Sequence, residues 1–213
     1  EEVTSLEFGF KGSLGENTSL NASLFRYDYT DFQVLQVVGI QTVTRNAGDA
    51  TVNGLELEAL TNVSDSLTLN YGVTLLDATY GDFLNTNGLE PQLGVQQLEG
   101  NYLSNAPKVS VNFGLNYTNI LSSGSSLTYR ANAAYKSKIY FSEFNEYSQD
   151  AYTIVDLNLI WESADETFRS RFFIKNATDE EYISGYLSSA TGGGRFGQWG
   201  YPRTAGIEIQ RNF

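Results

Sequence analysis

The most constraining feature of this sequence is an alternation of apolar and polar residues that continues over unusually long segments. In residues 67–75, apolar side chains occupy the odd positions and Thr, Asn or Gly the even ones, and residues 109–117 repeat the pattern. Such alternation predicts a strand with one apolar and one polar face. Nine segments are expected to be strands, at about residues 6–10, 20–35, 55–59, 67–80, 109–117, 127–141, 155–161, 168–174 and 201–213.

The connections between these segments alternate in length. Short turns are expected at residues 15–17, 64–65, 122–124 and 164–165, whereas long connections are expected at 37–49, 82–106, 143–150 and 178–199. Outer-membrane β-barrels segregate short periplasmic turns from long extracellular loops in this way. Several segments also reach the roughly 9–11 residues that a tilted strand needs to cross a bilayer. The fold class that this pattern predicts is all-β, a transmembrane antiparallel meander β-barrel.

The two faces of these strands differ in the way that a membrane barrel requires. No apolar run exceeds three residues, so a transmembrane helix is not expected. The polar faces carry charges such as Glu56, Glu58, Arg130 and Arg171, which a dry protein core would not accept unpaired. Between residues 20 and 35 the apolar positions change parity after Leu24, and a β-bulge there would explain the change.

Composition excludes several classes of function. The chain contains no His and no Cys, which removes the Ser-His-Asp hydrolases and thiolate metal sites. A net charge of −12 argues against a nucleic-acid partner, whose phosphates need a basic surface. Acidic groups at residues 77–82, 143–150 and 179–181 lack a spacing that makes Ca²⁺ ligands converge. No enzymatic activity, catalytic residue, cofactor or metal is therefore predicted.

Several motifs resemble those of TonB-dependent receptors, and together they cover residues 45–213. Asn46 to Glu58 is similar to that family's "N-x-G-x-A-x-x-x-G-x-E-x-E" strand, and Ala106-Pro107-Lys108 opens a strand after a long loop. Residues 175–182 (KNATDEEY) resemble its "N-L-x-D-x-x-Y" segment, and residues 200–206 (GYPRTAG) its "G-x-P-R-x-x-G" entry into the last strand. The chain ends on Phe213, with Ile207 and Ile209 at alternating positions, which resembles the barrel-assembly signal of outer-membrane proteins.

The resemblance implies that residues 1–213 are the C-terminal part of a 22-stranded receptor barrel. The plug domain, the first strands and a signal peptide are expected to lie outside this sequence. The implied function is TonB-energised uptake of a scarce ligand, with a ferric siderophore as the expected cargo, across the outer membrane of a Gram-negative bacterium. A passive porin or small barrel, and a soluble all-β carbohydrate-binding module, remain alternatives.

Partners and contact residues follow from the same resemblance. The expected partners are outer-membrane lipid and lipopolysaccharide, the periplasmic TonB complex through the missing N-terminal region, the barrel-assembly machinery through the last strand, and an iron chelate. Ligand contacts are expected from polar and aromatic residues of the long loops. The candidates are Phe83, Asn85, Tyr102, Phe144, Tyr147, Tyr186, Arg195, Phe196 and Trp199.

Overall fold

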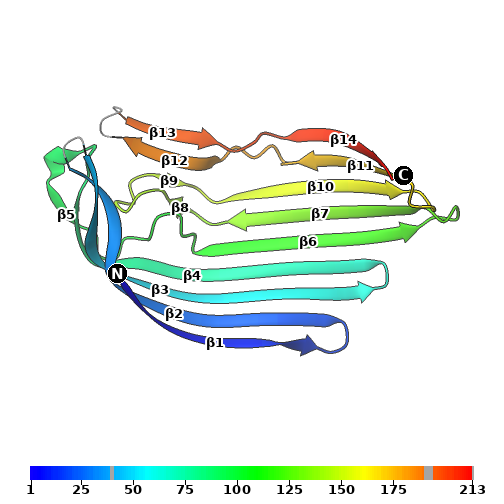
Figure 1. Ribbon diagram of the computed structural model, residues 1–213, viewed down its shortest axis with the longest axis horizontal. Helices are drawn as coiled ribbons and strands as arrows, with labels where there is room; N and C mark the ends of the chain where they lie inside the picture. Colours follow the sequence, from blue (N-terminus) through cyan, green and yellow to red (C-terminus); the bar gives the residue numbers. More distant parts are fainter. Residues whose placement is uncertain (39–40, 190–193, 213) are drawn as a thin grey trace.

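The computed structural model describes residues 1–38, 41–189 and 194–212. Nine long strands form one antiparallel sheet in which each strand pairs with the next long strand of the chain, so the predicted nine-stranded meander is confirmed. The strands are, in order, β1 (Glu2–Leu14), β2 (Thr18–Val38), β3 (Gln41–Ser64), β4 (Leu67–Thr86), β6 (Val109–Ile120), β7 (Ser126–Lys136), β10 (Tyr152–Glu162), β11 (Phe168–Lys175) and β14 (Thr204–Arg211). The sheet is open, with β1 and β14 at its lateral edges (Figure 1).

Short turns gather at one end of the sheet and the long connections at the other (Figure 1). Strand β1 runs towards the short-turn end, and the chain also ends there (Figure 1). Gly15, with φ of 66°, supplies the left-handed conformation of the first turn. At the next turn the Ser64 hydroxyl accepts hydrogen bonds from the backbone N–H groups of Ser66 and Leu67. The segregation predicted from the sequence is therefore present for the long connections after β4, β7 and β11.

The long connections contain secondary structure of their own. A 3₁₀ turn, η1 (Pro91–Leu93), leads into β5 (Val95–Gln97), which pairs with the end of β4. Strand β8 (Ile139–Tyr140) pairs with β9 (Ser148–Gln149), and β12 (Ile183–Ser189) pairs with β13 (Gly194–Trp199). We call this end of the molecule the loop end. Its small core consists of Tyr80, Phe83 and Leu98, against which Phe32, Val34, Leu103 and Phe144 pack.

The predicted long loop at residues 37–49 is wrong. Strands β2 and β3 continue as a paired ribbon to Val38 and from Gln41, while residues 39 and 40 lie outside the described residues. The segment is rich in Val and Thr, whose branched side chains favour extended backbone. The ribbon of β2 and β3 therefore extends beyond the ends of the neighbouring strands.

The predicted bulge after Leu24 is also wrong. The pairing of β2 with β3 is regular from Thr18 to Tyr29, and the register shifts only between Tyr29 and Gln33, where Asp31 has a φ of 54°. The apolar residues change from even to odd positions because the apolar row on the face of Leu20 and Ala22 ends at Leu24. The next residues on that face, Arg26 and Asp28, form an ion pair of 2.7 Å.

We call the apolar side of the sheet the outward face. One row of this face joins directly opposed residues of five strands, Phe10, Ala22, Leu57, Val73 and Val111. Large apolar side chains elsewhere on this face also remain open to solvent, such as Phe8 at 67% and Ile207 at 71%. An exposed apolar surface of this extent is typical of the lipid-facing side of a membrane β-barrel.

The opposite side, the inward face, carries amides, hydroxyls and charged groups. No helix among the described residues has the length and hydropathy needed to cross a membrane.

Candidate functional site

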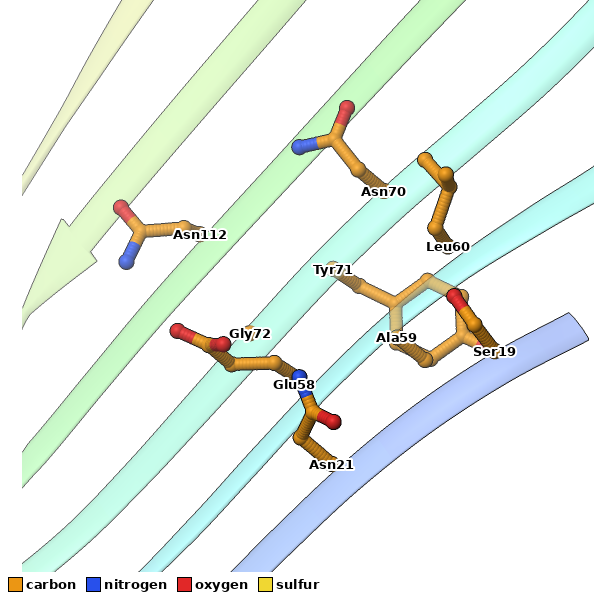
Figure 2. Close-up of a pocket in the computed structure, with 9 residues that line it drawn as sticks. All are labelled: Ser19, Asn21, Glu58, Ala59, Leu60, Asn70, Tyr71, Gly72 and Asn112. Carbon is orange, nitrogen blue, oxygen red and sulfur yellow. The ribbon is translucent and has the colours of Figure 1, made fainter. Parts of the chain in front are cut away.

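A polar hollow of about 320 Å³ lies on the inward face where β2, β3, β4 and β6 run side by side (Figure 2). Asn21, Glu58, Asn70 and Asn112 direct their polar groups into this region, and Gly72 leaves the middle of its floor bare (Figure 2). These groups donate and accept hydrogen bonds, and the hollow holds one carboxylate. Its chemistry suits the surface of a polar molecule or protein segment.

The charges of the inward face are separated along the sheet. Glu7 and Glu56 line a second hollow of about 350 Å³, which shares Glu58 with the first and contains one cation, Lys11. The far strands carry most of the basic groups: Arg130 on β7 and Arg169, Arg171 and Lys175 on β11. Arg171 pairs with Glu208 of β14 at 3.0 Å. A partner of this face would therefore meet an acidic sector, then amides, then a more basic sector.

An aromatic surface covers the inward face of β2 above the polar hollow. The rings of Phe25 and Tyr27 stack at 5.0 Å, and Phe25 lies over Gly54, where any Cβ would collide with the ring. Tyr29 contacts Phe32 at 5.7 Å, and Phe32 continues the contact into the core at Tyr80. The sequence analysis did not select these residues as ligand contacts, although the change of apolar positions after Leu24 marked them.

Asparagine side chains join the two loops on either side of β6 and β7. Asn85 donates to Glu143 at 3.0 Å, and Asn87 donates to Glu146 at 2.9 Å. Asn145 accepts from the Tyr102 N–H at 2.7 Å and donates to the carbonyl of the same residue at 2.9 Å. Burial raises the pKa of the Glu143 carboxyl above its usual value, with a smaller contribution from Glu146.

Arg195 of β13 connects the third loop to the other two. Its Nη2 lies 2.9 Å from Glu90 and 3.2 Å from Glu146, and the guanidinium lies 4.2 Å from the centre of the Tyr147 ring. Burial opposes the charge, but the hydrogen bonds with Glu90 and Glu146 outweigh it and raise the pKa of Arg195. Tyr186 stacks on Tyr147 at 5.9 Å beside this contact. We call Arg195, Glu90, Glu146 and Tyr147 the loop clasp.

The nine loop residues expected to contact a ligand occupy two kinds of environment. Seven contact other loop residues: Phe83, Asn85, Tyr102, Phe144, Tyr147, Tyr186 and Arg195. Phe83 is only 1% exposed, so it would reach a ligand only if its core opened. Phe196 and Trp199 are 54% and 67% exposed and remain accessible. Ligand contact by any of the nine stays a prediction.

Two of the motifs meet at the base of the last long loop. The Asn176 side chain is buried; it donates to the carbonyls of Glu180 and Tyr201 and accepts from the Glu180 N–H at 2.9 Å. Asp179 accepts from the Arg203 N–H at 2.9 Å, and its carboxylate lies 3.5 Å from the Arg203 guanidinium. These motif residues therefore fasten the loop to the start of β14.

Tyr182 completes this junction. Its ring stacks on Tyr152 at 4.7 Å and covers Gly200, where a Cβ would collide with it.

The acidic groups considered for Ca²⁺ do not converge. Across residues 1–38, 41–189 and 194–212, no cluster of three or more Asp or Glu side chains could hold a metal ion. Of the expected barrel-assembly residues, Ile207 and Ile209 are exposed on the outward face of β14. The third, Phe213, lies outside the described residues.

A comparison with models of protein families identifies one family. The sequence model described as "TonB dependent receptor-like, beta-barrel" matches residues 1–177. No curated protein matches the sequence.

The fold is also similar to solved receptor structures. The ferric yersiniabactin uptake receptor FyuA from Yersinia pestis superposes with a TM-score of 0.81 at 19% identity, over 99% of this chain and 30% of its own. The siderophore receptor PiuA from Acinetobacter baumannii gives 0.76 at 21%, over 97% of this chain and 28% of its own. The ferric preacinetobactin receptor BauA from the same organism gives 0.72 at 19%, over 97% and 29%.

Proposed function

Because the chain belongs to the family of TonB-dependent receptor β-barrels, we propose that it forms part of an outer-membrane receptor for energised uptake of a ferric siderophore. It spans about 30% of the length of the receptors whose structures it resembles. The resemblance of residues 175–182 and 200–206 to motifs near the end of such receptors supports our proposal that residues 1–213 form the C-terminal part of the barrel. The plug domain, the remaining strands and the contact with the TonB complex would lie in the rest of the receptor.

The observation that carries this proposal is the family match over residues 1–177. The two faces of the sheet support it. The outward face offers a continuous apolar belt to lipid, while the inward face places charges and amides where only water or a polar partner can satisfy them.

The ligand would meet the loop end first. Phe196 and Trp199 present exposed rings there, and such rings stack well on the flat, unsaturated groups of many iron chelates. The aromatic surface of Phe25, Tyr27 and Tyr29 would line the next part of the route. The polar hollow at Asn70 and Asn112 would then line the barrel interior and offer hydrogen-bonding groups to the ligand.

An uptake assay with the full-length receptor tests the proposal. Cells that lack their own siderophore receptors should accumulate ⁵⁵Fe from a panel of ferric siderophores only when they express this receptor and an active TonB complex. Uptake that continues after TonB is deleted would replace the proposal with a passive porin. If no chelate is taken up while haem, cobalamin or a carbohydrate is, the energised mechanism stands and the proposed ligand class is wrong.

A further inference from the structure

The hairpin of β12 and β13 has two different faces. Strand register pairs Ser188 with Arg195 and Leu187 with Phe196. Successive side chains of a strand point to opposite sides, so Arg195 lies on one face and the pair of Leu187 and Phe196 on the other. Arg195 is partly buried, whereas Leu187 and Phe196 are exposed. One face of the hairpin is therefore held by the rest of the protein, and the other is open.

The held face packs on the connection between β8 and β9. Tyr186 shares this face with Arg195, because it lies two residues before Ser188 in the same strand. The Tyr186 ring stacks on Phe141 at 5.4 Å and on Tyr147 at 5.9 Å. The Arg195 guanidinium lies 4.2 Å from the centre of the Tyr147 ring. Tyr186 and Arg195 therefore fix the same side of the hairpin to the same loop.

A single nitrogen of Arg195 joins the hairpin to both of the other loops. The Nη2 atom lies 2.9 Å from Glu90, which immediately precedes η1, and 3.2 Å from Glu146, which lies between β8 and β9. The three side chains are only 24–31% exposed, so salt and water screen these ion pairs less than pairs on an open surface. Two charge-assisted hydrogen bonds therefore meet at one point of the hairpin.

The other two loops are joined to each other without Arg195. Asn85 donates to Glu143 at 3.0 Å, and Asn87 donates to Glu146 at 2.9 Å. Loss of the Arg195 side chain should therefore release the hairpin and leave these two loops in contact.

The positive charge of Arg195 is already engaged within the protein. Two carboxylates, Glu90 and Glu146, contact one guanidinium, so the loop clasp carries more negative than positive charge. An anionic ligand that approached Arg195 would have to displace these carboxylates. The guanidinium is therefore better suited to hold the hairpin in place than to bind the ligand itself.

We propose that Arg195 is a positioning residue that fixes the open face of the β12–β13 hairpin, and with it the Phe196 ring, before a ligand arrives. This inference rests on the proposed function, because it takes Phe196 as part of the surface that meets the ferric chelate. A surface that is already ordered loses less conformational entropy when a ligand binds. Arg195 thus raises the affinity for the ligand without contacting it.

Distance measurements by pulsed electron paramagnetic resonance test the positioning without any ligand. In the full-length receptor, spin labels replace Gln92 of η1 and Gln198 of β13, which are both exposed. The label-to-label distance should have one narrow distribution, and Arg195→Gln should broaden it. Arg195→Lys should restore it, because both carboxylates contact a single nitrogen, which an ammonium can replace. Lys138→Gln is the matched control: it removes an exposed loop-end charge that lies over the Tyr140 ring, and the distribution should stay narrow.

Binding measurements then test whether Arg195 acts through Phe196. The probes are the ferric siderophores of the uptake panel, titrated against the full-length receptor. Arg195→Gln should weaken binding about tenfold, the loss expected if the released hairpin has its binding arrangement for about a tenth of the time. In a receptor that already carries Phe196→Ala, the same substitution should cost less than about twofold, because the ring that Arg195 positions is gone.

Three results would overturn the inference and leave the proposed function intact. They are a narrow distance distribution in Arg195→Gln, a broad one that Arg195→Lys does not restore, and a tenfold loss of affinity that persists in the Phe196→Ala receptor. The last result would show that Arg195 contacts the ligand itself. A receptor that binds none of the ferric siderophores would refute the proposed function, and the role of Arg195 in binding would be refuted with it.

Discussion

Replacing Asn176 by Ala should open the base of the last long loop. The Asn176 side chain makes three hydrogen bonds to the backbone of Glu180 and Tyr201, and its own φ is 48°. Three bonds at about 1 kcal/mol each amount to about 3 kcal/mol. The left-handed backbone, which Asn tolerates better than Ala, adds about 1 kcal/mol. Local opening should therefore become easier by about 4 kcal/mol.

Amide hydrogen exchange of the full-length receptor measures this opening directly. A change of about 4 kcal/mol corresponds to exchange about 900-fold faster at the Glu180 amide, since each 1.36 kcal/mol is a factor of ten. Asn105→Ala is the control, because Asn105 has a φ of 59° but an exposed side chain. This variant should lose only the backbone contribution of about 1 kcal/mol, so amide exchange around residue 105 should become roughly fivefold faster. Acceleration below about tenfold at Glu180, or equal acceleration by the two variants, would refute the reasoning.

Three further variants test the loop end and the sheet. Arg195→Gln should make residues 183–189 more susceptible to a protease, because the ion pairs with Glu90 and Glu146 are lost, and protection equal to wild type would contradict the loop clasp. Burial raises the pKa of Glu143, so the neutral carboxyl favours the folded loops, and the stability of the loops should fall as pH rises through that raised pKa. Glu143→Gln should therefore reduce the difference in melting temperature between pH 5 and pH 7.5. An unchanged difference would reject this role. In urea unfolding, Gly48→Ala should destabilise the pairing of β3 and β4 by about 1–3 kcal/mol, because the new Cβ would lie 2.8 Å from the Cβ of Phe83. Gly72→Ala is the control and should have little effect, because the nearest atom to its new Cβ would be 3.8 Å away.

The sequence was most informative where one physical requirement acted on every second residue. A strand with lipid on one side and water on the other must alternate, so Leu67 to Leu75 and Val109 to Tyr117 could be assigned to faces without a structure. The same requirement explains the one error in assigning residues to faces, which is the bulge predicted after Leu24. The parity changed at Phe25 because the belt had ended, and a bulge was the wrong explanation.

Loop contacts could not be predicted in the same way. The bond from Asn87 to Glu146 and the one from Arg195 to Glu90 join residues 59 and 105 positions apart, and no period in the sequence marks such pairs. Loop aromatics such as Phe83 look identical in sequence whether they form a core or contact a ligand. The motifs at Asn176 and Asp179 were recognisable, but their structural role became visible only when Tyr201 and Arg203 were seen beside them.

The central claim is that one face of this sheet contacts lipid and the other lines a polar interior. Residues 1–213 contain no Cys, so single cysteines can be introduced along β4 and spin-labelled in the reconstituted full-length receptor, once any Cys elsewhere in it is replaced. The measurement is the accessibility of each label to oxygen, which enriches in lipid, and to a water-soluble nickel chelate. Labels at 69, 71, 73 and 75 should favour oxygen, and labels at 70, 72 and 74 the chelate. Accessibility that does not alternate along these seven positions would contradict the account.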